Sequence, residues 1–189
     1  MRDALARLYG ATRDARWADL VRECAGTLER HAVPDHGGLN WPAVERDGPP
    51  LKCQWCVGAP GIGLFWTRAY EVLGDPAYLQ MATAAGECTY GYGDVRANPS
   101  QCHGLSGNAE LFIELHRVTR DGLWLERAHD FARQIMRYCS PGRTGSDEGD
   151  VWRGDEPGNT SPDYAYGAAG PGHFFLRLLS PDRVRWALD

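Results

Sequence analysis

The sequence predicts an all-α protein built from repeated helical hairpins. Apolar residues recur at three- and four-residue spacing through paired segments, and short polar turns separate the two segments of each pair. One turn pattern, an aspartate followed three residues later by a large aromatic residue, occurs three times: Asp14 and Trp17, Asp75 and Tyr78, and Asp121 and Trp124. A repeated hairpin with loops of different lengths is typical of a helical-repeat architecture.

The expected helices form three pairs and one unpaired segment. Their ranges are 5–9 with 17–28, 65–73 with 78–90, 111–118 with 124–139, and 173–179 alone. The aspartate of each turn is expected to cap the second helix of its pair, because its side chain can accept hydrogen bonds from the first backbone N–H groups. The aromatic residue is expected to pack at the corner of the hairpin.

Glycine pairs with Gly-x-x-Gly spacing lie at the starts of three expected helices: Gly58 and Gly61, Gly104 and Gly107, and Gly167 and Gly170. Glycine allows neighbouring backbones to approach closely around a common axis. A ring of helical hairpins requires such an approach. We therefore expect residues 1–189 to form a single domain, a partial α/α toroid of about three and a half hairpins.

Three long segments rich in proline and glycine connect the hairpins, at residues 33–51, 91–101 and 140–161. Loops of this length often form functional sites. Within the first loop, residues 35–41 are expected to form a short strand or the edge of a lid, and we favour a lid.

Composition narrows the class of protein. The 189 residues are 43% hydrophobic, enough for one domain with a core, and the formal net charge is −5 with acidic and basic residues intermixed. This charge argues against a nucleic-acid partner and against a polybasic membrane surface. The sequence has no apolar run of about 18 residues and no charged-then-apolar leader. We therefore expect a cytoplasmic protein with reduced cysteines.

A metal site is indicated by Cys102 and His103, because thiolate and imidazole are preferred ligands of zinc. Cys56 lies in the same local context, just before a Gly-x-x-Gly that opens a helix. If the two helix starts converge, Cys56, Cys102 and His103 form a three-ligand site with a fourth position open for chemistry. Cys53 is the alternative fourth ligand, since Cys53 and Cys56 form a Cys-x-x-Cys, and it would give a closed structural site. Three other cysteines are expected to be packing thiols on helices: Cys24, Cys88 and Cys139.

The two motifs resemble those of a known family. Trp55-Cys56-x-Gly58-x-Pro60-Gly61, followed by Cys102-His103-Gly104, is similar to the pattern of the lanthionine synthetase C-like family, the cyclases of lanthipeptide biosynthesis. The resemblance implies an α/α toroid with Zn²⁺ held by Cys56, Cys102 and His103. It also implies a dehydrated precursor peptide as substrate, in which a cysteine thiol adds to dehydroalanine or dehydrobutyrine. It covers only the C-terminal half of the usual family length.

Further site residues are expected around this metal. Lys52 lies where family members commonly carry a basic residue, which can hold a thiolate or a developing enolate oxygen; an ordinary loop lysine is the alternative. Trp55, His36 and His173 are expected to line the substrate pocket.

The family's proton donor is a histidine in a further His-Gly motif, which the repeat spacing would place before Met1. We therefore expect these residues to retain the zinc ligands without that acid. A homodimer, or a partner chain supplying the other half of the ring, is expected to cover the open faces of the end hairpins. A non-catalytic zinc-binding scaffold, or pseudo-cyclase, is one alternative function. A carbohydrate-active toroid is a weaker one, because paired carboxylates do not stand in motif positions.

Overall fold

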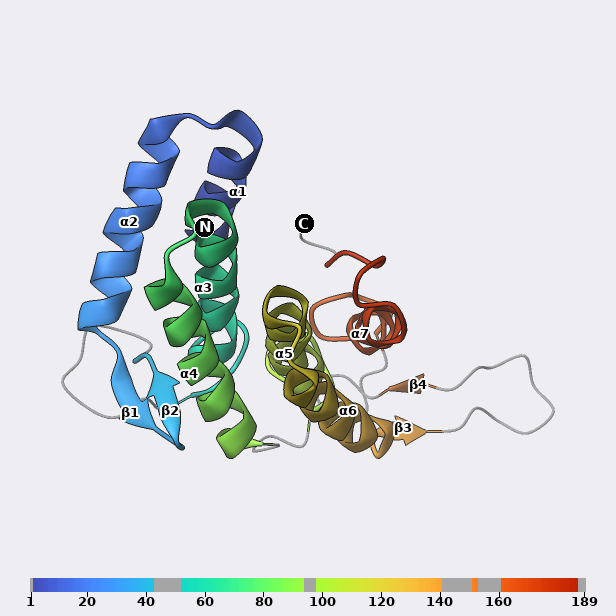
Figure 1. The fold of residues 1–189 in the computed structure, drawn as a ribbon. Helices are drawn as coiled ribbons and strands as arrows, with labels where there is room; N and C mark the ends of the chain where they lie inside the picture. Colours follow the sequence, from blue (N-terminus) through green and yellow to red (C-terminus); the bar gives the residue numbers. More distant parts are fainter. Residues whose placement is uncertain (1, 43–51, 94–97, 141–150, 153–160, 187–189) are drawn as a thin grey trace. The chain divides into compact units, whose positions relative to one another are not determined.

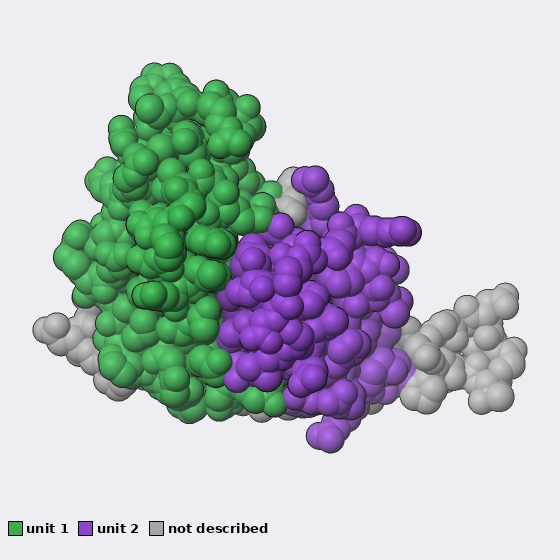
Figure 2. All heavy atoms as spheres, in the orientation of Figure 1, with its two compact units in different colours: residues 1–53, 57–92 green, residues 54–56, 93–189 purple. Residues whose placement is uncertain are grey.

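The computed structural model describes residues 2–42, 52–93, 98–140, 151–152 and 161–186, and this part of the chain is mainly helical (Figure 1). The all-α prediction is confirmed. The chain divides into two compact units, coloured separately in Figure 2: residues 1–53 with 57–92, and residues 54–56 with 93–189. We call them unit 1 and unit 2. None of the helices in the described ranges has the length and apolar character needed to span a membrane.

Unit 1 contains two helical hairpins, α1 (Arg2–Thr12) with α2 (Ala15–Arg30), and α3 (Ala59–Leu73) with α4 (Pro76–Tyr92). The predicted aspartate caps are present: Asp14 accepts a hydrogen bond from Arg16 N (3.0 Å), and Asp75 accepts one from Ala77 N (2.9 Å). Tyr78 is buried at its hairpin corner against Trp66, with ring centroids 5.4 Å apart. The aspartate and the aromatic residue of the turn therefore have the structural roles expected of them.

A short β-hairpin follows α2. Strands β1 (Val33–Asp35) and β2 (Gly38–Asn40) pair antiparallel, so a strand does occur in residues 35–41. The favoured lid prediction is wrong, because this hairpin is packed into unit 1. A Cβ atom on Gly38 would lie 2.0 Å from the carbonyl oxygen of Ala84 on α4, and the buried Trp41 indole donates to Leu28 O (2.8 Å).

Unit 2 contains the third hairpin, α5 (Leu105–Thr119) with α6 (Gly122–Met136), and the single helix α7 (Ala169–Leu179). Asp121 caps α6 by accepting a hydrogen bond from Leu123 N (2.9 Å), and the buried Trp124 stacks on Phe112 of α5. The predicted helix 124–139 is too long at its C-terminal end. Cys139 belongs to strand β3 (Cys139–Ser140), which pairs with β4 (Val151–Trp152), so Cys139 is not a helical packing residue.

Helices α3 and α5 begin at their Gly-x-x-Gly motifs, several residues before the apolar runs from which they were predicted. The N-cap residues are Gly58 and Gly104. A Cβ atom on Gly104 would lie 2.3 Å from Asn98 O, so a larger residue would displace the loop that leads into α5. The glycines thus allow close backbone contact at the helix starts. The prediction of a single toroid domain stays a prediction.

Candidate metal centre

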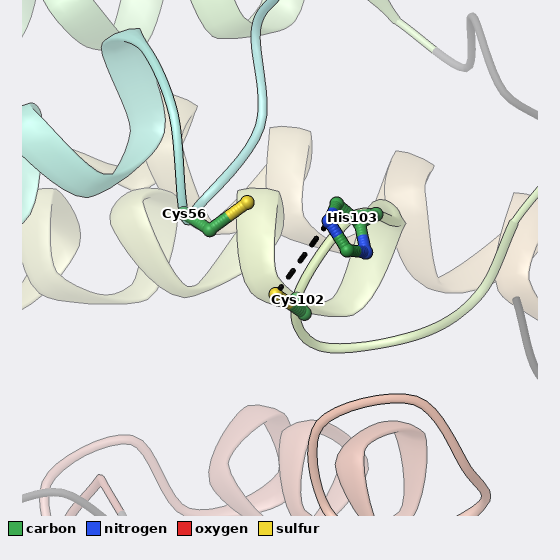
Figure 3. Close-up of side chains that lie close together, drawn as sticks. All are labelled: Cys56, Cys102 and His103. Carbon is green, nitrogen blue, oxygen red and sulfur yellow. Dashed lines mark hydrogen bonds between the residues drawn. The ribbon is translucent and has the colours of Figure 1, made fainter. Parts of the chain in front are cut away.

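Cys56, Cys102 and His103 lie together in unit 2 (Figure 3). Their ligand atoms all lie within 4.8 Å of one another, and Cys102 Sγ is 3.9 Å from His103 Nε2. Cys56 is exposed, Cys102 is buried and His103 is half-buried, so one side of the group is accessible to solvent. The structure brings together the three residues that were predicted as ligands.

The backbone holds the two ligand loops against each other. Cys56 N donates to Cys102 O (3.4 Å), and the Gln54 side chain donates to His103 O (3.4 Å). On the other side, Cys102 N donates to Ala165 O (2.8 Å), in the turn that precedes α7. Three segments far apart in the sequence therefore meet at the group.

The donor set and its spacing fit a tetrahedral zinc ion. With Zn–S near 2.3 Å and Zn–N near 2.1 Å, a sulfur and a nitrogen ligand lie about 3.6 Å apart, and two sulfurs lie about 3.8 Å apart. The largest separation in the group exceeds these values by only about 1 Å. Two thiolates and one imidazole leave one tetrahedral position for water or a substrate, the arrangement of catalytic rather than structural zinc sites. Metal binding itself stays a prediction.

Cys53 belongs to unit 1 and is not among the residues of the described ligand group. Its side chain is 4% exposed. A hydrogen bond with the Cys88 thiol and burial raise the pKa of Cys53 far above its usual range. The choice between the open three-ligand site and the closed four-ligand alternative stays a prediction.

Two predicted site residues also belong to unit 1. Lys52 is exposed, and its carbonyl accepts a hydrogen bond from Asn40 Nδ2 (3.3 Å). His36 lies in the turn between β1 and β2, where its Nδ1 is 2.7 Å from Asp35 Oδ1 and its ring packs on Tyr92. Burial opposes ionisation of Asp35, but hydrogen bonds from Asn40 and His36 outweigh burial and lower its pKa. The contacts named here all lie within unit 1. The predicted roles of Lys52 and His36 at the metal site stay predictions.

His173 is in unit 2 but is not part of the described ligand group. Its Nε2 is 3.1 Å from Arg185 O, and its Nδ1 is 3.7 Å from Glu110 Oε1. Both ring nitrogens thus face acceptors of the protein itself. The predicted place of His173 in the substrate pocket stays a prediction.

The aromatic surroundings of the ligands include one residue that sequence reasoning missed. The Tyr166 ring stacks on the His103 ring, with centroids 5.5 Å apart and planes inclined by 23°, although Tyr166 is 47% exposed. Asp163 holds this turn by accepting a hydrogen bond from Tyr166 N (2.7 Å). Trp55, a predicted pocket residue, packs edge-on against Trp186. In the sequence, Tyr166 is marked by its position directly before Gly167 of the third glycine pair.

Comparison with known proteins identifies the family. The sequence profile described as "Lanthionine synthetase C-like protein" matches residues 3–188. Glutathione S-transferase LANCL1 of Danio rerio is 32% identical over 151 residues, which cover 78% of this chain and 33% of that protein. LanC-like protein GCL1 of Arabidopsis thaliana is 31% identical over 121 residues, covering 62% of this chain and 27% of that protein. The chain thus spans about one third of the length of the curated relatives it matches.

Among solved structures, the chain is similar to an inactive variant of the α-1,6-mannanase GH76A of Salegentibacter sp. in complex with α-1,6-mannotriose. The TM-score is 0.62 with 17% identity, and the match covers 96% of this chain and 56% of the mannanase. At this identity the likeness concerns the fold alone, and it confirms the α/α-toroid class. Together with the profile match over nearly the whole sequence, these findings show that the chain belongs to the lanthionine synthetase C-like family.

Proposed function

We propose that this chain activates a substrate thiol at a Zn²⁺ ion held by Cys56, Cys102 and His103, for addition to a dehydroalanine or dehydrobutyrine residue. The observation that carries the proposal is the convergence of two thiols and one imidazole in a three-ligand group with an exposed side. A bound zinc ion would lower the pKa of a coordinating thiol, so that the nucleophilic thiolate forms near neutral pH.

The reaction is a net addition and needs no further reagent. The substrate sulfur forms a bond to the β-carbon of the dehydroamino acid, the carbon–carbon double bond breaks, and the α-carbon takes up one proton. The thiol loses the proton that balances this uptake. The product is a thioether, and nothing is released.

The protein contributes a rigid frame for the ligands. Hydrogen bonds to Cys102 N and O hold this ligand from both sides, through Ala165 and Cys56. The exposed Cys56 and the half-buried His103 leave access for a peptide, and the Tyr166 ring covers one face of His103. A frame of this kind places the thiol without reorganisation during the reaction.

Two thiol donors are consistent with this chemistry. The family resemblance favours a cysteine of the same dehydrated peptide, which gives a lanthionine ring. The relative named glutathione S-transferase LANCL1 favours a separate thiol such as glutathione as a second candidate. A zinc-stabilised scaffold without activity is the third outcome that an experiment has to distinguish.

The test uses the zinc-loaded chain and two peptides. The first carries one dehydroalanine and one cysteine, and the second carries dehydroalanine with serine in place of cysteine and is mixed with glutathione. Ring formation leaves the mass unchanged but removes the thiol that alkylation would label, whereas transfer adds one glutathione. Cys102→Ala should abolish either product, and Cys24→Ala, on α2 and not a member of the described ligand group, should not. Zinc binding without either product would support the scaffold.

A further inference from the structure

A ladder of buried charges joins α5 to α7 in the unit that contains the ligand group. Glu110 and Glu114 lie four residues apart on α5, and Arg177 on α7 is 1% exposed. Arg177 Nη1 donates to Glu110 Oε2, and Arg177 Nη2 donates to Glu114 Oε1. Arg117 contacts Glu114 as well (2.8 Å), so two guanidinium groups balance the two carboxylates.

Two members of this ladder, Glu114 and Arg177, favour their charged forms. Burial opposes ionisation of Glu114, but Arg177 and Arg117 outweigh burial and lower the pKa of Glu114. Burial likewise disfavours the charged form of Arg177, and the two glutamates more than compensate and raise its pKa. The hydrogen bond between Arg177 and Glu114 therefore joins two charged groups in the interior, the strongest kind of hydrogen bond in a protein.

Both helices of the ladder begin at loops that contact the ligands. Helix α5 begins at Leu105, directly after Gly104 and the ligand His103. Helix α7 begins at Ala169, just after the turn in which Ala165 O accepts from Cys102 N and Tyr166 stacks on His103. The position of α7 relative to α5 thus determines how the turn of Ala165 and Tyr166 contacts Cys102 and His103.

Buried ion pairs are a weak source of stability, because desolvation offsets most of the attraction between the charges. Their directional hydrogen bonds restrict geometry more than apolar contacts do. A guanidinium fork that binds two carboxylates fits one placement of the helices, whereas apolar side chains of similar size can pack in several. The position of Arg177 is therefore suited to fixing the register between α5 and α7.

We propose that Arg177, together with Glu110 and Glu114, positions the metal centre by fixing α7, and with it the turn of Ala165 and Tyr166, against Cys102 and His103. None of the three residues belongs to the ligand group, so they are positioning residues and not catalytic ones. The inference rests on the proposed function only in requiring that the ligand group binds metal.

The test measures metal geometry and affinity, not activity. Zn²⁺ affinity is measured by competition with a chelating dye, and Co²⁺ is added to record the thiolate charge-transfer and ligand-field bands, which depend on coordination geometry. The main variant combines Glu110→Gln, Glu114→Gln and Arg177→Met, which removes the three buried charges together and leaves only the half-buried Arg117 charged. We expect a folded protein with about 10-fold weaker zinc binding and a changed Co²⁺ spectrum.

Arg177→Lys is the conservative variant, since it retains the charge but loses the fork, and it should show an intermediate change. The matched control is Arg120→Gln, which breaks the exposed ion pair between Arg120 at the end of α5 and Asp182 after α7 (2.7 Å; side chains 64% and 60% exposed). This control should bind both metals as the wild-type protein does.

Wild-type affinity and spectrum in the folded triple variant would overturn the inference and leave the proposed function intact. If the triple variant does not fold, Arg177→Lys decides: a changed spectrum with unchanged circular dichroism supports positioning, and an unchanged spectrum overturns it. A wild-type protein that takes up neither metal would refute the proposed function itself and remove the basis of the inference.

Discussion

Gly107 is the residue at which a single added methyl group should disrupt the metal centre most directly. It lies in the first turn of α5, where both ligand loops approach it. A Cβ atom at this position would lie 1.8 Å from the backbone oxygen of Gln101 and 2.9 Å from Trp55 Cβ. Gln101 precedes Cys102, and Trp55 precedes Cys56, so a Gly107→Ala substitution pushes against the neighbours of two ligands.

The size of the effect follows from these distances. A Cβ atom needs a separation of about 3.2 Å from a carbonyl oxygen, so the backbone at Gln101 has to move by more than about 1 Å. Metal–ligand distances are restricted to about ±0.2 Å. Overpacking of this kind costs about 1–3 kcal/mol, and because 1.4 kcal/mol is a factor of about 10, we expect zinc affinity to fall about 5- to 150-fold.

The assay is zinc affinity by competition with a chelating dye, combined with thermal unfolding of the metal-free protein. Gly172→Ala is the matched control, since Gly172 also lies in the first part of a helix of unit 2, and its added Cβ meets nothing within 4 Å. This control should keep its zinc affinity and gain up to about 1 kcal/mol in stability. Wild-type zinc affinity in Gly107→Ala would refute the reasoning, because the two loops would then tolerate a displacement that the geometry excludes.

Elemental analysis should find about one zinc per chain, lost in Cys102→Ala or His103→Ala and retained in Cys53→Ala; equal loss with Cys53→Ala would indicate the closed site. Stability should fall as the pH decreases through the lowered pKa of Glu114. Because the ionised form of Glu114 stabilises the fold above its unfolded pKa near 4.3, the difference in unfolding free energy between the wild type and Glu114→Gln should shrink below about pH 4. Urea unfolding at pH 7 and pH 3.5 measures this, and a constant difference would contradict it. Light scattering should show a dimer or larger species at micromolar concentration, and a monomer that binds no apolar dye would count against the expected partner.

Features that depend on neighbouring residues in the sequence could be predicted. The aspartate caps of α2, α4 and α6 follow from hydrogen bonding between a side chain and a backbone N–H two residues away, so the turn motif alone locates them. The convergence of Cys56, Cys102 and His103 could be predicted for a similar reason, because Cys102 and His103 are adjacent and Cys56 precedes a matching glycine motif. Their role as metal ligands stays a prediction. The C-terminal end of α6 and the packing of the β-hairpin could not be predicted, since each depends on a distant segment. Cys139 pairs with Trp152, and Gly38 lies against Ala84 on α4.

The division of roles between Cys53 and Cys56 shows why a Cys-x-x-Cys spacing could not settle the ligand set. Gly58 has φ of 116°, a conformation that side-chain-bearing residues rarely adopt, and a Cβ atom there would lie 2.5 Å from Lys52 O and 3.2 Å from Cys53 Cα. The chain therefore turns back on itself between residues 52 and 58. In this turn Cys53 enters the core of unit 1 beside Cys88, and Cys56 remains exposed with its sulfur directed to Cys102 and His103 (Figure 3). Gly58 thus belongs to the turn in which one cysteine is buried and the other is exposed, a difference that the spacing of the two thiols does not predict.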